Sequence, residues 1–390
     1  MNEMDKRYEQ FGTELFGPFL YGFACWLKDA LSERKISKVF FLARDGYMMK
    51  SAFDILASGA DMESRYIYAS RNSLRLSLLW QCSDYEDSLR YLSRARYIQF
   101  QDIMEYYGFS SEESDRIGCE SGLSADHDFE FSKLPQESVL KDIYTRCRSV
   151  ICERSRKNFE NVTAYFRQSG MTGRFALVDI GWHGSMQYYI SEIMSLAGMK
   201  AEISGFYVGT LTRPEFQIET RGFLYDSADP GLRKSVLCSF GILEKLFQSL
   251  EGSAKDYIVK NGQVVPELKP YEYADDPAMQ RHIRAWQSGA LDYVVRHRDT
   301  PGKCRLEYVR MAMPLIQFGK KPDLRRLALF RSFYNTDGTR VYYLPQKGIF
   351  RYKPGEFAHA LSNSPWKTGF MRAAFRLPLP YHLIYDWLKK

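Results

Sequence analysis

Four apolar residues run directly into a short polar turn near the start of the chain, in the sequence Lys-Val-Phe-Phe-Leu-Ala-Arg-Asp-Gly-Tyr at positions 38–47. Residues 38–42 favour a buried β-strand, and residues 48–56 favour a helix. Open α/β sheets build ligand sites where a strand ends at the start of a helix, because the first amides of the helix then face the ligand. The pattern therefore predicts an anion site beyond this strand and leaves Asp45 for another task.

The same pattern recurs at residues 175–187, where Phe-Ala-Leu-Val-Asp leads through Ile-Gly-Trp-His-Gly into Ser-Met-Gln. We expect a strand over 175–179 and a helix over 185–196. Further strands are predicted at 65–69 and 203–208. Strands that alternate with helices at this spacing indicate an α/β fold with a parallel, Rossmann-like sheet.

The segments around this sheet are predicted to be mainly helical. A helix over 8–33 precedes the first strand. Residues 74–168 form a helical insertion between sheet strands, and its last helix spans 150–168. Together these elements form one domain, residues 1–265.

Beyond about residue 266 the alternation of strands and helices is lost. We expect a mainly helical accessory region over 266–390, with one hairpin that pairs 339–344 with 348–352. This part is also basic, with 17 Lys and Arg against 5 Asp and Glu over 301–390, whereas the first 300 residues hold 37 and 42. Such a region suits an anionic partner.

Aromatic residues lie beside Lys and Arg in this basic region, as in Trp-Lys-Thr-Gly-Phe-Met-Arg at 366–372 and in residues 381–390. This mixture suits peripheral contact with an anionic membrane leaflet. The alternative is that basic helices simply pack on the core. Nucleic acid is not an expected partner, because no recognised binding motif accompanies the charge.

The composition is that of an ordinary globular protein, with 45% hydrophobic and 26% charged residues. No stretch approaches the roughly 20 apolar residues of a membrane span, and no signal-peptide pattern is evident. Seven scattered Cys without paired short spacing indicate a reducing compartment and no zinc site. We therefore expect a cytoplasmic protein.

The sequence argues against several other types of site. A phosphatase of the haloacid dehalogenase type needs an Asp nucleophile two positions before Asp45, where this chain has Ala43. Neither a P-loop nor a Gly-x-Gly-x-x-Gly turn is present. Ser185 lacks the Gly-x-Ser-x-Gly elbow of a serine nucleophile.

The two strand ends resemble those of phosphoribosyltransferases, in the expected chain order. Residues 42–46 resemble the loop that holds pyrophosphate, and residues 178–185 resemble the loop that holds the ribose and its 5-phosphate. The second loop departs from the usual pattern: Ile180 replaces an acidic residue, and Gly-Trp-His-Gly-Ser replaces a Thr-rich turn. An ordinary nucleotide-salvage enzyme is therefore not expected.

A narrower resemblance rests on Phe-Leu-Ala-Arg-Asp-Gly-Tyr at 41–47, Tyr-Ala-Ser-Arg at 68–71 and Val-Asp-Ile-Gly-Trp-His-Gly-Ser-Met-Gln at 178–187. It continues through Gly-Phe-Tyr at 205–207 and Glu-Lys-Leu-Phe at 244–247 to Glu-Gly-Ser at 251–253. Over residues 38–266 the chain is similar to bacterial glycan-assembly proteins with a phosphoribosyltransferase-like domain.

This resemblance implies a ribofuranosyltransferase of O-antigen or capsule synthesis. The donor would be phosphoribosyl pyrophosphate with Mg²⁺, and the acceptor a sugar hydroxyl on a lipid-linked glycan. A separate phosphatase would later remove the 5-phosphate. A non-catalytic scaffold protein of such an assembly complex remains an alternative, because of Ile180, and a phosphatase is a third.

The resemblance also assigns roles to residues. Asp45 would be the base that deprotonates the acceptor, with a helix cap as its alternative, and Asp179 would hold the ribose hydroxyls and is the nearest candidate ligand for donor-bound Mg²⁺. No protein cage for the metal is visible. The other expected donor contacts are Ala43, Arg44, Gly46, Ser70, Arg71, Gly181, Trp182, His183, Gly184 and Ser185.

Two of these residues have a second possible role. His183 is expected to shape the loop more than to touch phosphate, and Trp182 is as well suited to the core as to a sugar platform. Glu244 and Glu251 are expected on solvated helix faces.

Overall fold

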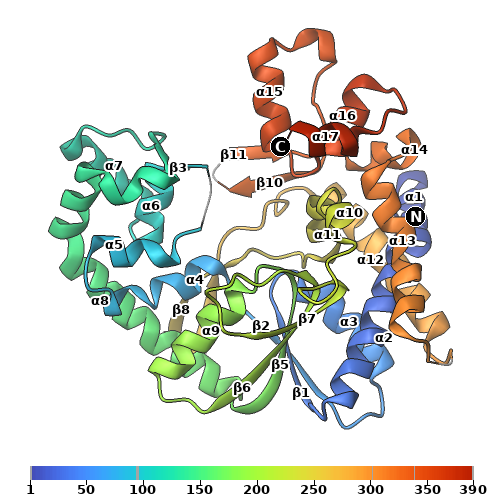
Figure 1. The fold of residues 1–390 in the computed structure, drawn as a ribbon, viewed down its shortest axis with the longest axis horizontal. Coiled ribbons are helices and arrows are strands. Elements are labelled where there is room, and N and C mark those ends of the chain that lie inside the picture. The colour runs from blue at the N-terminus through green and yellow to red at the C-terminus, as the bar shows by residue number, and fades with distance from the viewer. Residues whose placement is uncertain (1, 94–95, 301, 338, 389–390) are drawn as a thin grey trace.

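A five-stranded parallel sheet forms the centre of the protein in the computed structural model, which describes residues 2–93, 96–300, 302–337 and 339–388 (Figure 1). In their spatial order the strands are β2 (Glu63–Ile67), β1 (Lys38–Leu42), β5 (Gly173–Trp182), β6 (Ala201–Thr210) and β7 (Glu219–Tyr225). The predicted α/β class with a parallel sheet is thus confirmed. The four strands predicted for this sheet are all present, with ends shifted by a few residues except at β1, and β7 was not predicted.

The chain order of the strands reverses between β1 and β5. From β1 the chain moves outward to β2, and later it moves from β5 in the opposite direction to β6 and β7. Phe41 lies beside Val178 across this junction. The crevice at such a reversal is where open α/β sheets bind ligands. Both strand ends predicted to carry the site therefore meet at this position.

Alternate side chains of β1 enter two different hydrophobic cores. Val39 and Phe41 belong to one core, and Phe40 and Leu42 belong to the other. This follows from the two-residue repeat of a strand, and a sheet covered on both faces makes both sets apolar. Figure 1 shows α2, α12 and α13 on one side of the sheet, with α8 and α9 on the other.

The N-terminal helices cover the first face. The predicted helix over 8–33 consists of α1 (Glu3–Phe11), a π-helical turn (Gly12–Phe16) and α2 (Gly17–Glu33). Three further helices pack against α2. They are α3 (Gly46–Leu56), α12 (Pro277–His297) and α13 (Arg305–Lys320). Trp286 of α12 and Phe19 of α2 are fully buried in the same core.

The insertion covers the second face together with α9 (Ser185–Leu196), whose bounds agree with the prediction. Its helices are α4 (Arg71–Leu76), α5 (Tyr85–Ser88), α6 (Phe100–Tyr106), α7 (Ser111–Ser121) and α8 (Ser138–Gln168). The helix predicted from residue 150 begins at Ser138. A small hairpin of β3 (Tyr97–Gln99) and β4 (Asp128–Glu130) was not predicted.

After β7 come α10 (Arg233–Leu237), α11 (Phe240–Phe247) and the hairpin of β8 (Ala254–Lys260) with β9 (Gln263–Leu268). The predicted boundary near residue 266 falls within β9. The helices α12 and α13 share a core with the N-terminal helices, and the division into two domains stays a prediction.

The C-terminal part holds α14 (Leu324–Leu327), β10 (Tyr334–Asp337), β11 (Thr339–Tyr342), α15 (Pro354–Asn363), α16 (Lys367–Phe375) and α17 (Tyr381–Leu388). The predicted hairpin is wrong. The strand β11 pairs antiparallel with the preceding strand β10, and residues 349–351 form a 3₁₀ turn. Within the described ranges, no helix is long and apolar enough to cross a membrane.

Candidate functional site at the β1–β5 strand ends

Asp45 lies between β1 and α3, after a cis peptide bond between Ala43 and Arg44. Its side chain makes no capping hydrogen bond to α3, so the alternative role as a helix cap is not what the structure contains. A Cβ at Gly46 would lie 2.9 Å from both the carbonyl carbon and the Cβ of Phe41. A glycine is therefore needed for α3 to begin so close to β1, and this turn fixes the position of Asp45.

Three carboxyl groups interact at the strand ends. Burial raises the pKa of Asp45 to about 6, although the charges of Arg44 and Lys245 oppose the rise. Burial, and next the negative charge of Asp45, raise the pKa of Asp179 to about 8. The same two causes raise the pKa of Glu244 to about 8.

Carboxyl groups that interact in this way titrate together, and near neutral pH some of them keep their protons. Asp45 has the lowest pKa of the three and therefore gives up its proton first. A carboxylate that ionises near pH 6, beside two neutral carboxylic acids, is suited to general-base chemistry. The predicted pair Asp45 and Asp179 is thus brought together, and Glu244 joins it.

Glu244 was expected on a solvated helix face, and this expectation is wrong. Its Oε1 accepts a hydrogen bond of 3.1 Å from Nε1 of Trp182. Glu251 is also only partly exposed. Its Oε2 accepts a hydrogen bond of 3.0 Å from the Tyr68 hydroxyl. The helix α11 contains Glu244 and Lys245 within the otherwise apolar sequence Phe-Gly-Ile-Leu-Glu-Lys-Leu-Phe. Two charged residues in so apolar a helix are the signal that sequence reasoning missed.

Arg44 is bound by a buried carboxylate. Its Nη1 lies 2.6 Å from Oε2 of Glu272 and donates a second hydrogen bond of 3.2 Å to the Glu251 carbonyl. The Nζ of Lys245 lies 2.8 Å from the other oxygen of Glu272. Both Lys245 and Glu272 are almost completely buried. The predicted contact of Arg44 with pyrophosphate stays a prediction, and this ion-paired group had no counterpart in the sequence analysis.

Arg71, the first residue of α4, acts on all three carboxyl groups. Its positive charge opposes the rise in the pKa of Asp45 and of Asp179, and it does the same for Glu244. The residue is exposed. Arg71 is therefore a cation within electrostatic reach of the carboxyl groups and open to a ligand.

Ser70 is fixed in the local structure. Its hydroxyl donates to the Ala254 carbonyl at 2.6 Å and accepts from the Ser73 amide at 3.1 Å as the cap of α4. These contacts tie the end of β2 to β8, and they orient the helix that carries Arg71. The proposed contact of the Ser70 hydroxyl with a donor stays a prediction.

The end of β5 and the loop that follows it depend on glycines. Gly181 has a φ of +108°, and a Cβ there would lie 2.5 Å from the Gly209 carbonyl oxygen. Gly184 has a φ of +73° and precedes Ser185, the first residue of α9. No side chain caps this end of α9. First-turn amides without a side-chain cap are suited to bind an anion, which agrees with the expected phosphate loop.

Trp182 and His183 differ in their surroundings. The Trp182 ring packs on Phe240 with centroids 4.4 Å apart, and its indole N–H is used by Glu244. Trp182 therefore joins the core and orients a carboxyl group. His183 is exposed, with Nδ1 3.3 Å from the Leu211 carbonyl oxygen, a contact that suits the loop-shaping role.

No group of three His, Cys, Asp or Glu suited to hold a metal ion occurs within the described ranges. The oxygen-rich pair Asp45 and Asp179 nevertheless has the hard donor atoms that Mg²⁺ prefers. A metal bound mainly through donor oxygens, with Asp179 beside it, thus stays a prediction.

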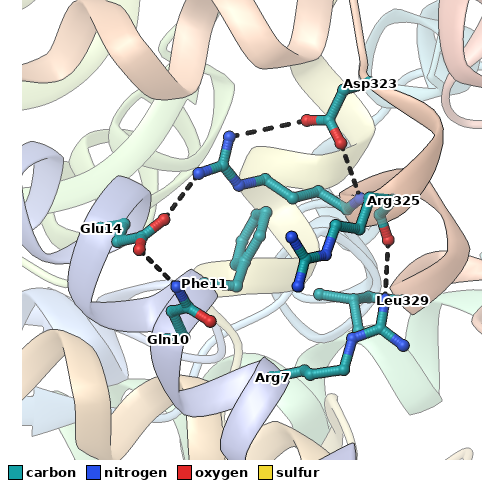
Figure 2. A pocket seen from close by; sticks show the side chains of 8 residues that line it. Arg7, Gln10, Phe11, Glu14, Asp323, Arg325 and Leu329 are labelled. Atoms are coloured by element: carbon teal, nitrogen blue, oxygen red, sulfur yellow. Dashed lines mark hydrogen bonds and ion pairs between the residues drawn. The ribbon is translucent and has the colours of Figure 1, made fainter.

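A surface cavity of about 200 Å³ lies elsewhere, between α1 and the segment around α14 (Figure 2). Arg326 in its wall contacts Glu14 at 2.6 Å and Asp323 at 3.6 Å. Nη2 of Arg7 donates to the Arg325 carbonyl at 3.0 Å. These groups mainly pair with one another and join two parts of the chain, and none of the predicted site residues lines this cavity.

No family model matches the chain, and no curated protein matches it in sequence. Its function must therefore be inferred from the residues of the β1–β5 site.

Proposed function

We propose that the protein transfers a 5-phosphoribosyl group from phosphoribosyl pyrophosphate to a sugar hydroxyl of a bacterial surface glycan. The observation that supports this most is the half-buried carboxyl group of Asp45 at the reversal of strand order, whose pKa burial raises to about 6. A sugar hydroxyl is a poor nucleophile and needs a base close to the anomeric carbon, whereas a nucleobase nitrogen does not. An ionisable carboxyl group in the crevice meets that need.

In this reaction the bond between the anomeric carbon and the pyrophosphate oxygen breaks, and pyrophosphate leaves with the electron pair. The acceptor oxygen forms the new bond to the same carbon, and its proton passes to the Asp45 carboxylate. Because Asp45 is held at the end of β1 by the close approach of Gly46 to Phe41, its position relative to a bound donor is fixed before the acceptor arrives.

The other residues bind and orient the donor. The amides of the Gly181–Ser185 loop and the first turn of α9 would hold the 5-phosphate, and Asp179 would hydrogen-bond the ribose hydroxyls. Arg71 would face the pyrophosphate, since its charge already reaches the carboxyl groups. Mg²⁺, held by donor oxygens with Asp179 beside it, would neutralise charge on the leaving group. A separate phosphatase would then remove the 5-phosphate from the product.

The test is pyrophosphate release from phosphoribosyl pyrophosphate, with Mg²⁺ and a panel of lipid-linked and synthetic glycans. Asp45→Asn should abolish release, while calorimetry should still detect donor binding. Asp61→Asn, at an exposed position after α3, is the matched control and should behave like the wild type. If Asp45→Asn retains activity, the base is another residue. If the wild type neither binds the donor nor releases pyrophosphate, the proposed function is wrong.

A second candidate is a non-catalytic binding protein of a glycan-assembly complex. Ile180 stands where an acidic residue is usual and is 3% exposed, so it contributes no oxygen to a donor. This candidate predicts donor binding without pyrophosphate release for every acceptor, which the same assay detects.

A further inference from the structure

A run of exposed apolar side chains extends from the end of α16 through the connecting segment into the first part of α17, near the C-terminal end of the described chain. Leu377 is 54% exposed, Leu379 is 47% exposed and Leu383 is 58% exposed. Phe375 and Ile384 at the ends of the run are exposed as well. Side chains of this size are normally buried, and a contiguous exposed group of them indicates an interaction surface.

A second exposed aromatic residue lies beside this run. Phe350, in the 3₁₀ turn before α15, is fully exposed at 101%. Two residues later a row of rings begins: Tyr352 is 5.7 Å from Phe357, and Phe357 is 6.0 Å from Phe375. Phe375 in turn stacks on Tyr381 at 6.2 Å. The row joins Tyr352, two residues after Phe350, to Phe375 in the run, so the turn and the run are neighbours in the structure.

We call this surface the C-terminal apolar face; it consists of Phe350, Phe375, Leu377, Leu379, Leu383 and Ile384. Figure 1 shows its helices α15, α16 and α17 gathered together at the top of the view, beyond the sheet and its covering helices. The face is therefore carried by a part of the molecule that extends away from the α/β core.

Basic residues are interleaved with the C-terminal apolar face. Residues 347–390 contain eight Lys and Arg but only two Asp and Glu. Arg351 follows Phe350, and Arg376 separates Phe375 from Leu377; both are exposed. Lys353 is exposed in the same turn. Apolar side chains with cations between them suit a surface that is apolar below and negatively charged at its boundary.

We propose that the C-terminal apolar face docks on the surface of an anionic lipid bilayer. The apolar side chains would enter the boundary between headgroups and acyl chains, while Arg351 and Arg376 remain at the level of the lipid phosphates. A second copy of this chain is a poorer occupant, because it would bring the same basic residues against one another. The inference does not depend on the proposed transferase activity.

The test is co-sedimentation of the full chain with vesicles of phosphatidylcholine alone and of phosphatidylcholine mixed with phosphatidylglycerol. The wild type should pellet with the anionic vesicles, less at high salt, and little with the neutral ones. Leu377→Ser with Leu379→Ser should weaken vesicle binding about tenfold or more. Arg351→Gln with Arg376→Gln should remove the preference for anionic lipid. Val259→Ser, at a 66% exposed position in β8, is the matched control and should bind like the wild type.

Thermal unfolding of each variant establishes that it is folded, and all substituted side chains are exposed. The proposal is overturned if the wild type does not pellet with anionic vesicles, or if the leucine variant binds them as well as the wild type. It is also overturned if the wild type forms a dimer that the leucine variant lacks, since a second copy would then occupy the face. Pyrophosphate release with a water-soluble acceptor should be unchanged in these variants, so a failure here is distinct from a failure of the proposed function.

Discussion

Asp179 should lower the stability of the folded protein at neutral pH, and Asp179→Asn should remove this cost. Burial, with a further contribution from the charge of Asp45, raises the pKa of Asp179 from 3.8 to about 8. An acid of this kind keeps its proton to a higher pH in the folded chain than in the unfolded chain. Titration of Asp179 therefore leaves the free energy of unfolding unchanged below about pH 3.8 and lowers it as the pH rises from there towards 8. Asparagine has nearly the same shape and no titrating proton.

The expected magnitude follows from the size of the shift. One pKa unit corresponds to about 1.4 kcal/mol, and at pH 7 the difference between 3.8 and 7 amounts to about 4 kcal/mol of lost stability. This is an upper value, because Asp179 is only half-buried and water screens part of its charge. With about 2 cal/mol/K of unfolding entropy per residue over 390 residues, the loss corresponds to roughly 5 °C in Tm. At pH 5 the same calculation leaves about 1.6 kcal/mol, or roughly 2 °C.

The measurement is the Tm of the wild type and of Asp179→Asn by circular dichroism across this pH range. We expect the variant to unfold at the higher temperature, with a gain that grows between about pH 5 and pH 7. Asp61→Asn changes an exposed carboxylate and should give a difference near zero throughout. The reasoning is refuted if Asp179→Asn is less stable than the wild type at pH 7, or if its gain is independent of pH.

Two further predictions concern the same site. Turnover should increase with pH through a midpoint near 6, because burial raises the pKa of Asp45 to about 6 and only its ionised form accepts a proton; a rate independent of pH between about 5 and 7 would contradict this. Lys245→Met should lower the free energy of unfolding by about 3–5 kcal/mol in urea titrations, because Glu272 would lose one of two buried cations. Adding Glu272→Gln should restore part of the loss, and no recovery would show that packing, not charge, sets the cost.

The elements nearest the site follow closely from local sequence. The strand over residues 38–42 and the helix over 185–196 agree with the predicted bounds. Both have strong local signals, an apolar run that ends in a polar turn and a helical repeat that starts after glycine. The strand β7 was missed because Glu219–Tyr225 begins with a charged and polar stretch, and its β-structure depends on pairing with β6.

The sequence predicted only those site residues that lie at a strand end or shortly after it. Asp45 and Asp179 occupy the ends of neighbouring strands, and parallel order places them together. Glu244, Lys245 and Glu272 reach the site from segments far along the chain. Such contacts depend on tertiary packing, and a single sequence has no periodicity that reports them.

The buried Glu272 also affects which cation can meet a donor. Arg44 is held by Glu272, which is 4% exposed, so pyrophosphate could take Arg44 only by displacing a short buried ion pair and leaving Glu272 with Lys245 alone. Such a displacement is unfavourable because it removes one partner from a buried charge. Arg71 needs no such exchange, since no ion pair within the described ranges holds it. The exposed Arg71 is thus the better candidate for the pyrophosphate contact, and the pair of Arg44 and Glu272 serves to hold the turn that positions Asp45.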